Sequence, residues 1–225
     1  DNAWFGKNSP FNIEDEINKT WQASTEKISF SNETNKSWQD YVKVTRLEIT
    51  CGEAPYITSR YDAVTGEYIA VQNRIGLLDR KLRIVNENID KKEEWLEWAK
   101  IAVQNVYGFD WQGDNVLLAR ENVLFTVVEH YQYKFNEGFE IKELIEFAKI
   151  IVWNIWQMDG LKFVVPNSCC TQTKTEQTLF ETLTISTECE GCKKGNSQKH
   201  NGIYCKIKDW RTGKTVRFVD LTEGK

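Results

Sequence analysis

One stretch constrains the fold of this chain more than any other: residues 105–124, which read NVYGFDWQGDNVLLARENVL. Its first part is a short apolar run that ends in Asp110, and this pattern predicts a buried strand with an acidic last side chain. Asp114 and Asn115 are residue types that commonly cap helices, and apolar residues recur at helical spacing after them. The stretch therefore predicts a strand, an acidic residue, a tight turn and a helix.

This arrangement has a functional and a purely structural interpretation. In open parallel α/β sheets, ligands lie beyond the carboxyl ends of the strands, and an acidic residue there commonly holds ribose hydroxyls. A capped turn in any α/β protein would give the same pattern around Asp110.

The rest of the chain alternates between strand and helix patterns. Strands are expected at residues 46–51 and 152–156, and the second of these runs into Asp159 and Gly160. Helical patterns cover residues 76–88, 92–104 and 141–151, and residues 64–67 favour a hairpin turn. This order predicts an α/β fold with a mostly parallel sheet and right-handed crossovers.

The N-terminal segment is expected to form an amphipathic helix and a linker. Ser9 and Pro10 suit a helix start, and Ile13, Ile17 and Trp21 then repeat every four residues. Polar residues 24–37 lack periodicity and indicate a loop. The chain is thus expected to comprise an N-terminal helix and linker (1–40), an α/β domain (41–168) and a cysteine-rich basic segment (169–225).

The charge of the chain is unevenly distributed. The formal net charge is −4, yet residues 191–217 hold eight Lys or Arg and one acid, so this window carries +7 and the remainder −11. A basic segment on an acidic body can contact phosphates, although a solvated charged loop has the same composition. Residues 203–209 and 215–221 are expected to form a two-stranded ribbon. The candidate DNA-contacting residues on it are Lys206, Lys208, Arg211 and Lys214.

Five of the six cysteines lie between residues 169 and 205. Cys189 and Cys192 have the CxxC spacing that lets two thiolates bind one zinc ion, with Gly191 relieving the backbone between them. Zinc requires four ligands, and the further candidates are Cys169, Cys170 and Cys205, with His200 competing for the fourth position. A closed site of this kind would be structural, whereas unligated or redox-active thiols are the alternatives.

Three segments together resemble the adenine-N6 DNA methyltransferases, the S-adenosylmethionine-dependent enzymes of restriction–modification systems. Residues 48–56 (EITCGEAPY) are similar to the first motif of that family, an acid followed by a glycine-containing turn that ends in an aromatic residue. Residues 105–124 resemble the second motif, a YGxD strand followed by a DNxxxARENL helix. Residues 155–161 (IWQMDGL) resemble the third motif, a strand that ends in GDAL.

The resemblance implies a Rossmann-like fold, a cofactor site and a nucleic-acid substrate. Gly52 and its neighbours, Glu48, Cys51 and Glu53, would face the methionine part of S-adenosylmethionine. Asp110 would hold the ribose hydroxyls, and Asp159 would contact the adenine amine. Enzymes of this kind take the target base out of the duplex, so the basic cysteine-rich segment would face DNA.

The chain departs from the family at three places, one of which is the long spacing from Gly52 to Asp110, which requires an inserted hairpin and two helices. Ala54 and Pro55 replace the second glycine of the first motif and its neighbour, and the proline removes an N–H donor. The catalytic tetrad of the family, Asn/Asp-Pro-Pro-Tyr/Phe, is absent, and residues 165–168 (VPNS) are the nearest run. The resemblance therefore implies a methyltransferase-like domain that is catalytically incomplete as this chain. Either a second polypeptide supplies the tetrad or catalysis has been lost.

Two other classes of function were weighed. A non-enzymatic interaction protein with the same fold, such as a phage or mobile-element factor acting on host defence, is the alternative. A hydrolase is disfavoured because His130 and His200 are isolated in the sequence. No apolar run approaches the ~20 residues that cross a bilayer, and the N-terminus lacks a signal-peptide pattern, so a cytoplasmic location without a membrane partner is expected.

Overall fold

The centre of the fold is a three-stranded parallel sheet, seen here in a computed structural model that describes residues 2–5, 9–15, 17, 20–30, 36–177 and 182–222. Its strands are β3 (Arg46–Ile49), β4 (Val106–Asp110) and β5 (Ile155–Gln157), and their order is β3-β4-β5. All three run parallel, with Leu47 opposite Tyr107 and Phe109 opposite Trp156. The predicted α/β class with a parallel sheet is confirmed.

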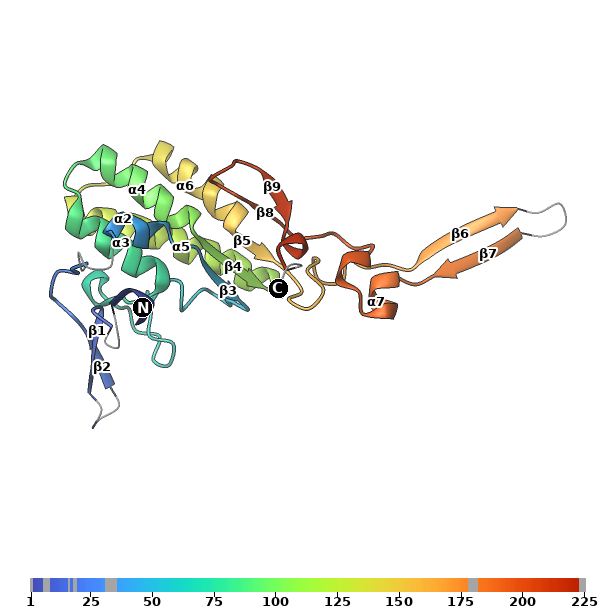
Figure 1. Cartoon of the computed structure of the whole chain (residues 1–225), viewed down its shortest axis with the longest axis horizontal. Coiled ribbons are helices and arrows are strands. Elements are labelled where there is room, and N and C mark those ends of the chain that lie inside the picture. The colour runs from blue at the N-terminus through green and yellow to red at the C-terminus, as the bar shows by residue number, and fades with distance from the viewer. Residues whose placement is uncertain are drawn as a thin grey trace.

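The main helices lie on one face of this sheet (Figure 1). They are α2 (Trp38–Lys43), α3 (Leu77–Asn88), α4 (Lys92–Gln104), α5 (Gly113–Phe135) and α6 (Ile141–Asn154). The pair α3 and α4 connects β3 to β4, and the pair α5 and α6 connects β4 to β5. Because the strands follow one another in a single direction, right-handed crossovers place every connecting helix on the same side.

The principal core lies between these helices and the sheet. The side chains of Leu82, Trp95 and Phe147 are completely buried there. The ring of Trp95 packs edge-on against Tyr131, with ring centroids 5.4 Å apart, and its indole N–H donates to Asn86 Oδ1 at 2.6 Å. Val106 of β4 belongs to this core, whereas Tyr107 and Phe109 belong to a second cluster on the other face of the sheet. Both faces of β4 are therefore buried, which explains its apolar sequence.

The second face of the sheet is covered by a C-terminal ribbon. Its strands β8 (Lys206–Lys208) and β9 (Thr215–Arg217) pair antiparallel and lead into the 3-10 turn η4 (Phe218–Leu221). Phe218 packs on Phe109 with ring centroids 4.8 Å apart, and the two belong to a second, smaller core. The predicted ribbon is confirmed, and it belongs structurally to the α/β body.

A slender hairpin separates this ribbon from the body in the sequence. Strands β6 (Gln172–Gln177) and β7 (Thr182–Thr187) pair antiparallel in full register. They project away from the body, and the short helix α7 (Glu190–Lys194) lies near their base (Figure 1). The 3-10 turn η3 (Ser197–Lys199) follows α7. The sequence analysis did not anticipate this hairpin.

The predicted N-terminal helix at residues 9–21 is wrong. After the short helix α1 (Asn2–Phe5), strands β1 (Asn12–Asp15) and β2 (Thr20–Ala23) form an antiparallel hairpin. Ile13 is 65 % exposed and Ile17 is 91 % exposed, so these two apolar side chains are not part of a core. Three apolar residues in a polar stretch are too few for a helix that needs tertiary packing.

Other boundaries shift by a few residues. Helix α6 continues to Asn154, so the apolar run from residue 152 is helical before it becomes strand β5. Helix α2 was not predicted, although Ser37 and Asp40 form a capping box at its start. The predicted hairpin at residues 57–71 is reduced to one antiparallel bridge between Tyr61 and Tyr68, followed by the 3-10 turn η2 (Val71–Asn73).

No helix in the described ranges combines the length and the apolar character needed to cross a bilayer.

Candidate metal centre and cofactor hollow

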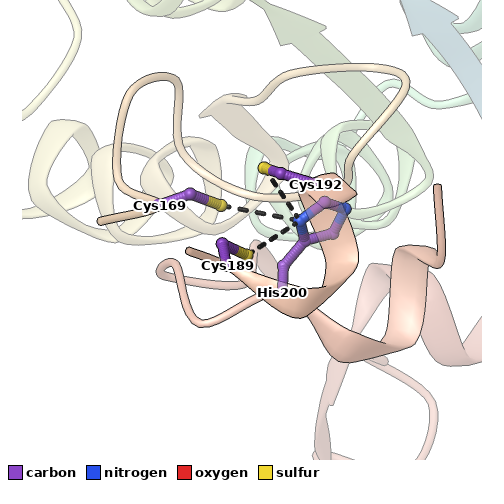
Figure 2. A group of neighbouring side chains, drawn as sticks. All are labelled: Cys169, Cys189, Cys192 and His200. Carbon is purple, nitrogen blue, oxygen red and sulfur yellow. Dashed lines mark hydrogen bonds between the residues drawn. The ribbon is translucent and has the colours of Figure 1, made fainter. Parts of the chain in front are cut away.

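Four side chains at the base of the projecting hairpin converge on one point. The Nδ1 atom of His200 lies 3.5 Å from the sulfur of Cys169 and 3.6 Å from the sulfurs of Cys189 and Cys192 (Figure 2). The four candidate ligand atoms all lie within 4.8 Å of one another. This group of three cysteines and one histidine can hold a metal ion.

Local structure explains how the group is assembled. Cys189 occupies the N-cap of α7 and Cys192 lies three residues later, so both sulfurs point to the same side of the first helical turn. Gly191 lies between them, and a Cβ atom there would come within 2.6 Å of the His200 backbone nitrogen and 2.7 Å of its Nδ1. The glycine is therefore required by the close approach of the histidine.

The thiols of this group differ in acidity. Burial opposes ionisation of Cys189, but backbone N–H groups of Asn201 and Cys192 donate to its sulfur and lower its pKa to about 6. Burial and the neighbouring thiols raise the pKa of Cys169 to about 11. One thiolate thus forms first and disfavours a second, which is the situation that a bound cation relieves.

Two predicted metal ligands lie outside the group. Cys205 is completely buried under the sheet, where its thiol donates to the backbone oxygen of Gln157 at 3.1 Å and burial raises its pKa to about 12. Cys170 is exposed, and its backbone bonds to Asn201. His200, the alternative candidate for the fourth ligand, belongs to the group in place of Cys170 and Cys205. Sequence spacing could not identify the fourth ligand, because Cys205 directly precedes the ribbon strand β8 and is buried in the body and not near α7.

A second feature lies at the carboxyl ends of β3 and β4. Four of the predicted cofactor-binding residues, Glu48, Cys51, Gly52 and Glu53, border a hollow of about 520 Å³. The strand ends where Thr50 adopts a left-handed conformation, and Gly52 repeats that conformation (φ 55°) in the following turn. The opposite wall includes Arg60 and Asn122.

Glu48 is the most perturbed carboxyl group at this hollow. Burial raises its pKa from the ordinary 4.5 to about 7. Its Oε2 atom is buried and has no hydrogen-bond partner among the described residues. Together with burial, Glu48 and Asp110 raise the pKa of the Cys51 thiol to about 12. The hollow therefore has an acidic, incompletely satisfied floor.

The two predicted adenosine-binding carboxylates are largely occupied by the protein itself. Asp110 accepts hydrogen bonds from the Gly52 N–H at 2.9 Å, the Gln112 N–H at 2.8 Å and the Asn115 side chain at 3.1 Å. Asn115 is thus a partner of Asp110, and the expected cap at residues 114 and 115 is wrong, because α5 begins at Gly113.

Asp159 lies two residues beyond the end of β5, and neither Asp159 nor Asp110 borders the hollow. Its Oδ1 accepts from the N–H groups of Leu161 and Lys162, and its backbone oxygen accepts from Phe163. It closes the turn that follows β5. Of these two carboxylates, only Asp110 is hydrogen-bonded to the segment that resembles the first motif, through the Gly52 N–H.

The predicted DNA-contacting residues are divided between the two ends of the ribbon. Lys206 pairs with Arg217 in register, whereas Arg211 and Lys214 lie in the turn between the strands. Arg211 borders a hollow of about 550 Å³ together with Lys43, Thr45 and Asn105. Thr45 and Asn105 directly precede β3 and β4, so this hollow lies at the amino ends of these strands. The turn of the ribbon therefore lies at the amino ends of the strands, whereas Glu48 lies near the carboxyl end of β3.

The four candidate DNA-contacting cations of the ribbon are Lys206, Lys208, Arg211 and Lys214. None of them forms an ion pair with a carboxylate among the described residues. The ammonium of Lys208 lies 4.5 Å from the ring centre of Trp210. These cations are available to an external anion.

Comparisons with known proteins gave no match. No protein-family model, no curated protein and no solved structure is similar to this chain at a significant level. Function is therefore inferred from the residues and geometry described above.

Proposed function

We propose that this chain is a Rossmann-like, S-adenosylmethionine-binding domain of a DNA adenine-N6 modification system, and that a second polypeptide supplies the missing catalytic tetrad. One observation carries the proposal. The segments that resemble the first two family motifs meet at the carboxyl ends of neighbouring parallel strands, where the Gly52 N–H donates to Asp110 at 2.9 Å. Ligands of open α/β sheets lie at this edge.

The chemistry of the hollow suits the cofactor. S-adenosylmethionine carries a sulfonium and an ammonium, and three carboxylates, Glu48, Glu53 and Asp62, border the hollow. The unpartnered Oε2 of Glu48 would gain a cationic partner, which would lower its pKa again. A volume of about 520 Å³ lies within the range of small-molecule and cofactor sites.

The geometry limits what Asp110 can contribute. A carboxylate offers about four acceptor positions, and three donors of the protein already use those of Asp110. Because Asp110 also does not border the hollow, it would chiefly hold the Gly52 turn in place. Without the tetrad, the chain alone would bind the cofactor but transfer no methyl group.

Titration with S-adenosylmethionine and S-adenosylhomocysteine tests the cofactor site. We expect a thermal shift equivalent to about 2.7 kcal/mol at a hundredfold excess over Kd. Glu48→Gln should weaken S-adenosylmethionine more than the neutral thioether of S-adenosylhomocysteine, because only the former carries a sulfonium. Glu67→Gln, in an exposed turn, is the matched control. A folded protein that shows no shift at saturating ligand would contradict the proposal.

The same proposal assigns zinc to the cysteine–histidine group. With Zn–S bonds of about 2.3 Å and Zn–N bonds of about 2.05 Å, a tetrahedron separates sulfur from nitrogen by about 3.6 Å. The three sulfur–nitrogen distances of 3.5, 3.6 and 3.6 Å agree with this value. Four protein ligands leave no position for water, so the zinc would be structural.

DNA contact is proposed for the free cations of the ribbon. Replacing Lys206, Lys208, Arg211 and Lys214 by Gln should weaken DNA binding at low salt and reduce the slope of log K against log salt concentration by about 3.6, or about 0.9 for each cation removed. Lys142→Gln with Lys149→Gln, on the surface of α6, is the control. An unchanged slope would show that the ribbon is merely solvated.

One observation favours the alternative, a non-enzymatic interaction protein that acts on host defence. The Asp159 carboxylate accepts from N–H groups of its own turn, and three donors of the protein bond to the Asp110 carboxylate. Both carboxylates therefore stabilise the fold, which a protein that binds no cofactor would also require. The cofactor titration separates the two functions, because the interaction protein would be folded and unresponsive to either ligand.

A further inference from the structure

An ionic cluster with an excess of positive charge adjoins the hollow beside Glu48. Arg60 and Arg74 share one carboxylate, that of Glu129, at nitrogen–oxygen distances of 2.6 and 2.5 Å. Burial alone would raise the pKa of Glu129, but the hydrogen bonds and charges of the two guanidinium groups lower it, so this carboxylate is ionised. Among the described residues, no further carboxylate pairs with either arginine, and the cluster therefore carries one uncompensated positive charge.

Water cannot compensate this charge fully, because both arginines are buried. Arg74 has no exposed side-chain area, and its Nη2 atom has no hydrogen-bond partner among the described residues. Arg60 is only 9 % exposed. A cation that is removed from water requires an anion or other acceptors in its place. The cluster therefore favours an anionic ligand.

Arg60 is the member of this cluster that borders the hollow of about 520 Å³. Its Nε and Nη2 atoms donate to the two oxygens of Glu129, and its Nη1 atom donates to Asn122 Oδ1 at 2.8 Å. A guanidinium carries five N–H donors, and these bonds use three of them. The remaining donors are on Nη1 and Nη2, and they are available to a ligand.

The neighbours of Arg60 fix the position of its guanidinium. The central carbon of this group lies 5.1 Å from the ring centres of Tyr61 and Phe125. Asn122 accepts from the guanidinium and donates through Nδ2 to the backbone oxygen of Glu53 at 2.8 Å. Glu53 lies in the turn that follows β3, so the guanidinium is tied to the turn at the edge of the hollow. A cation held in this way needs little reordering to bind a ligand.

The charges around the hollow define a class of ligand. Three carboxylates border the hollow, and Arg60 is the only basic residue among the described residues that border it. The unpartnered Oε2 of Glu48 can accept from a cation, whereas the remaining donors of Arg60 can bind an anion. An α-amino acid group carries an ammonium and a carboxylate close together, and it therefore matches both walls.

We propose that Arg60 binds the carboxylate of an α-amino acid group in the hollow and thereby selects ligands that carry one. This inference rests on the proposed function, in which the amino acid group is the methionine part of S-adenosylmethionine. The ligand carboxylate compensates the excess charge of the arginine cluster. A carboxylate suits a guanidinium because its two oxygens match neighbouring N–H donors. The ammonium and the sulfonium are left to the acidic side chains of the hollow.

Ligands that differ only in the carboxylate test this role without altering the protein. Isothermal titration calorimetry compares S-adenosylmethionine with decarboxylated S-adenosylmethionine, which retains the sulfonium, the amine and the adenosine. We expect the decarboxylated ligand to bind about ten- to a hundredfold more weakly, as for the loss of a hydrogen bond between charged groups.

Arg60→Gln extends the test to the protein. It should weaken S-adenosylmethionine by a similar factor and leave decarboxylated S-adenosylmethionine nearly unchanged, because that ligand has no carboxylate to lose. Arg83→Gln is the matched control. The Arg83 side chain is 14 % exposed and that of Arg60 is 10 % exposed, and each pairs with a glutamate whose side chain is 19 % exposed. The control should bind both ligands as the unmodified chain does.

Two results would overturn the role of Arg60 and leave the cofactor proposal standing. One is equal affinity of the unmodified chain for the two ligands. The other is an equal loss of affinity for both ligands in Arg60→Gln, since the arginine would then act only on the fold. If neither ligand binds the unmodified chain, the proposed function is wrong and this inference falls with it. If circular dichroism shows Arg60→Gln unfolded, the comparison of the two ligands on the unmodified chain decides.

Discussion

The α/β body and the cysteine–histidine module at residues 169–202 are held together by different forces. The body buries large apolar side chains such as Trp95 and Phe147 completely. In the module, Cys189 and Gly191 are the only buried residues of the described part. An element without an apolar core cannot offset its conformational entropy by burial. We therefore expect the order of the module to depend on a metal ion bound by its cysteines and histidine, whereas the order of the body depends on its apolar core.

This comparison predicts two separable stabilities. A cation at the cysteine–histidine group should fix the module and the base of the β6–β7 hairpin. It should leave the melting of the body nearly unchanged, because the ribbon that packs on the sheet leaves the module after His200.

Removal of the metal should have the largest effect. Zinc bound to sites of this type contributes on the order of 10 kcal/mol to folding, so chelation or Cys192→Ser should release the module. We expect rapid hydrogen exchange at residues 172–177 and 182–202, while the amides of β4 and α5 stay protected. Mass spectrometry should find one zinc per unmodified chain.

Cys170→Ser is the matched control for this experiment, because that exposed thiol lies outside the group. It should retain one zinc and normal exchange. Simultaneous release of the body on chelation would show that the two regions form one cooperative unit, contrary to the comparison.

Truncation of the body core should have the next largest effect. Trp95→Ala removes a completely buried indole and its hydrogen bond to Asn86, at a cost of about 3–5 kcal/mol. Denaturant unfolding followed by far-UV circular dichroism measures this loss. Zinc content should not change below the transition. Trp111→Ala, with a side chain that is 47 % exposed, should cost about 0.5 kcal/mol or less.

The smallest expected effect is a pH dependence of the body. Burial raises the pKa of Glu48 from 4.5 to about 7, so the folded state binds this proton more tightly than the unfolded state. The stabilising contribution is complete below pH 4.5 and is lost as the pH rises to about 7.

Glu48→Gln abolishes that loss and should therefore be more stable than the unmodified chain above about pH 7. Because Glu48 is only partly buried, solvent screening reduces the expected gain to about 1 kcal/mol. Below pH 4.5 the two proteins should be nearly equally stable. Thermal unfolding at several pH values checks this, with Glu67→Gln as control. A gain that is independent of pH would show that ionisation of Glu48 is not its cause.

The spacing of apolar residues predicted those helices and strands that are specified by residues within the element itself. Strand β4 was predicted at its observed bounds, because a short apolar run between a helix and an acidic turn has few alternatives. Helices α3 and α4 carry apolar residues at helical spacing and were also predicted. The N-terminal hairpin was missed because the spacing of Ile13 and Trp21 fits a helix equally well, and only pairing of residue 14 with Trp21 decides against it.

The candidate sites were predictable in part for the same reason. The CxxC spacing and the glycine within it act over one helical turn, so Cys189, Cys192 and Gly191 were identified from sequence. The choice between His200 and Cys205 depended on where the chain runs after α7. The orphaned carboxyl oxygen of Glu48 likewise results from packing between distant segments.

The alternation of strands and helices, the parallel sheet and the positions of Gly52, Asp110 and the cysteines near the ends of elements could be predicted from the sequence. These depend on hydrophobic periodicity and on caps and turns, which act over a few residues. Only the tertiary structure decided which carboxylates are free and which four side chains face one another. Such properties arise because long-range packing sets burial and hydrogen bonding, and no local pattern encodes them.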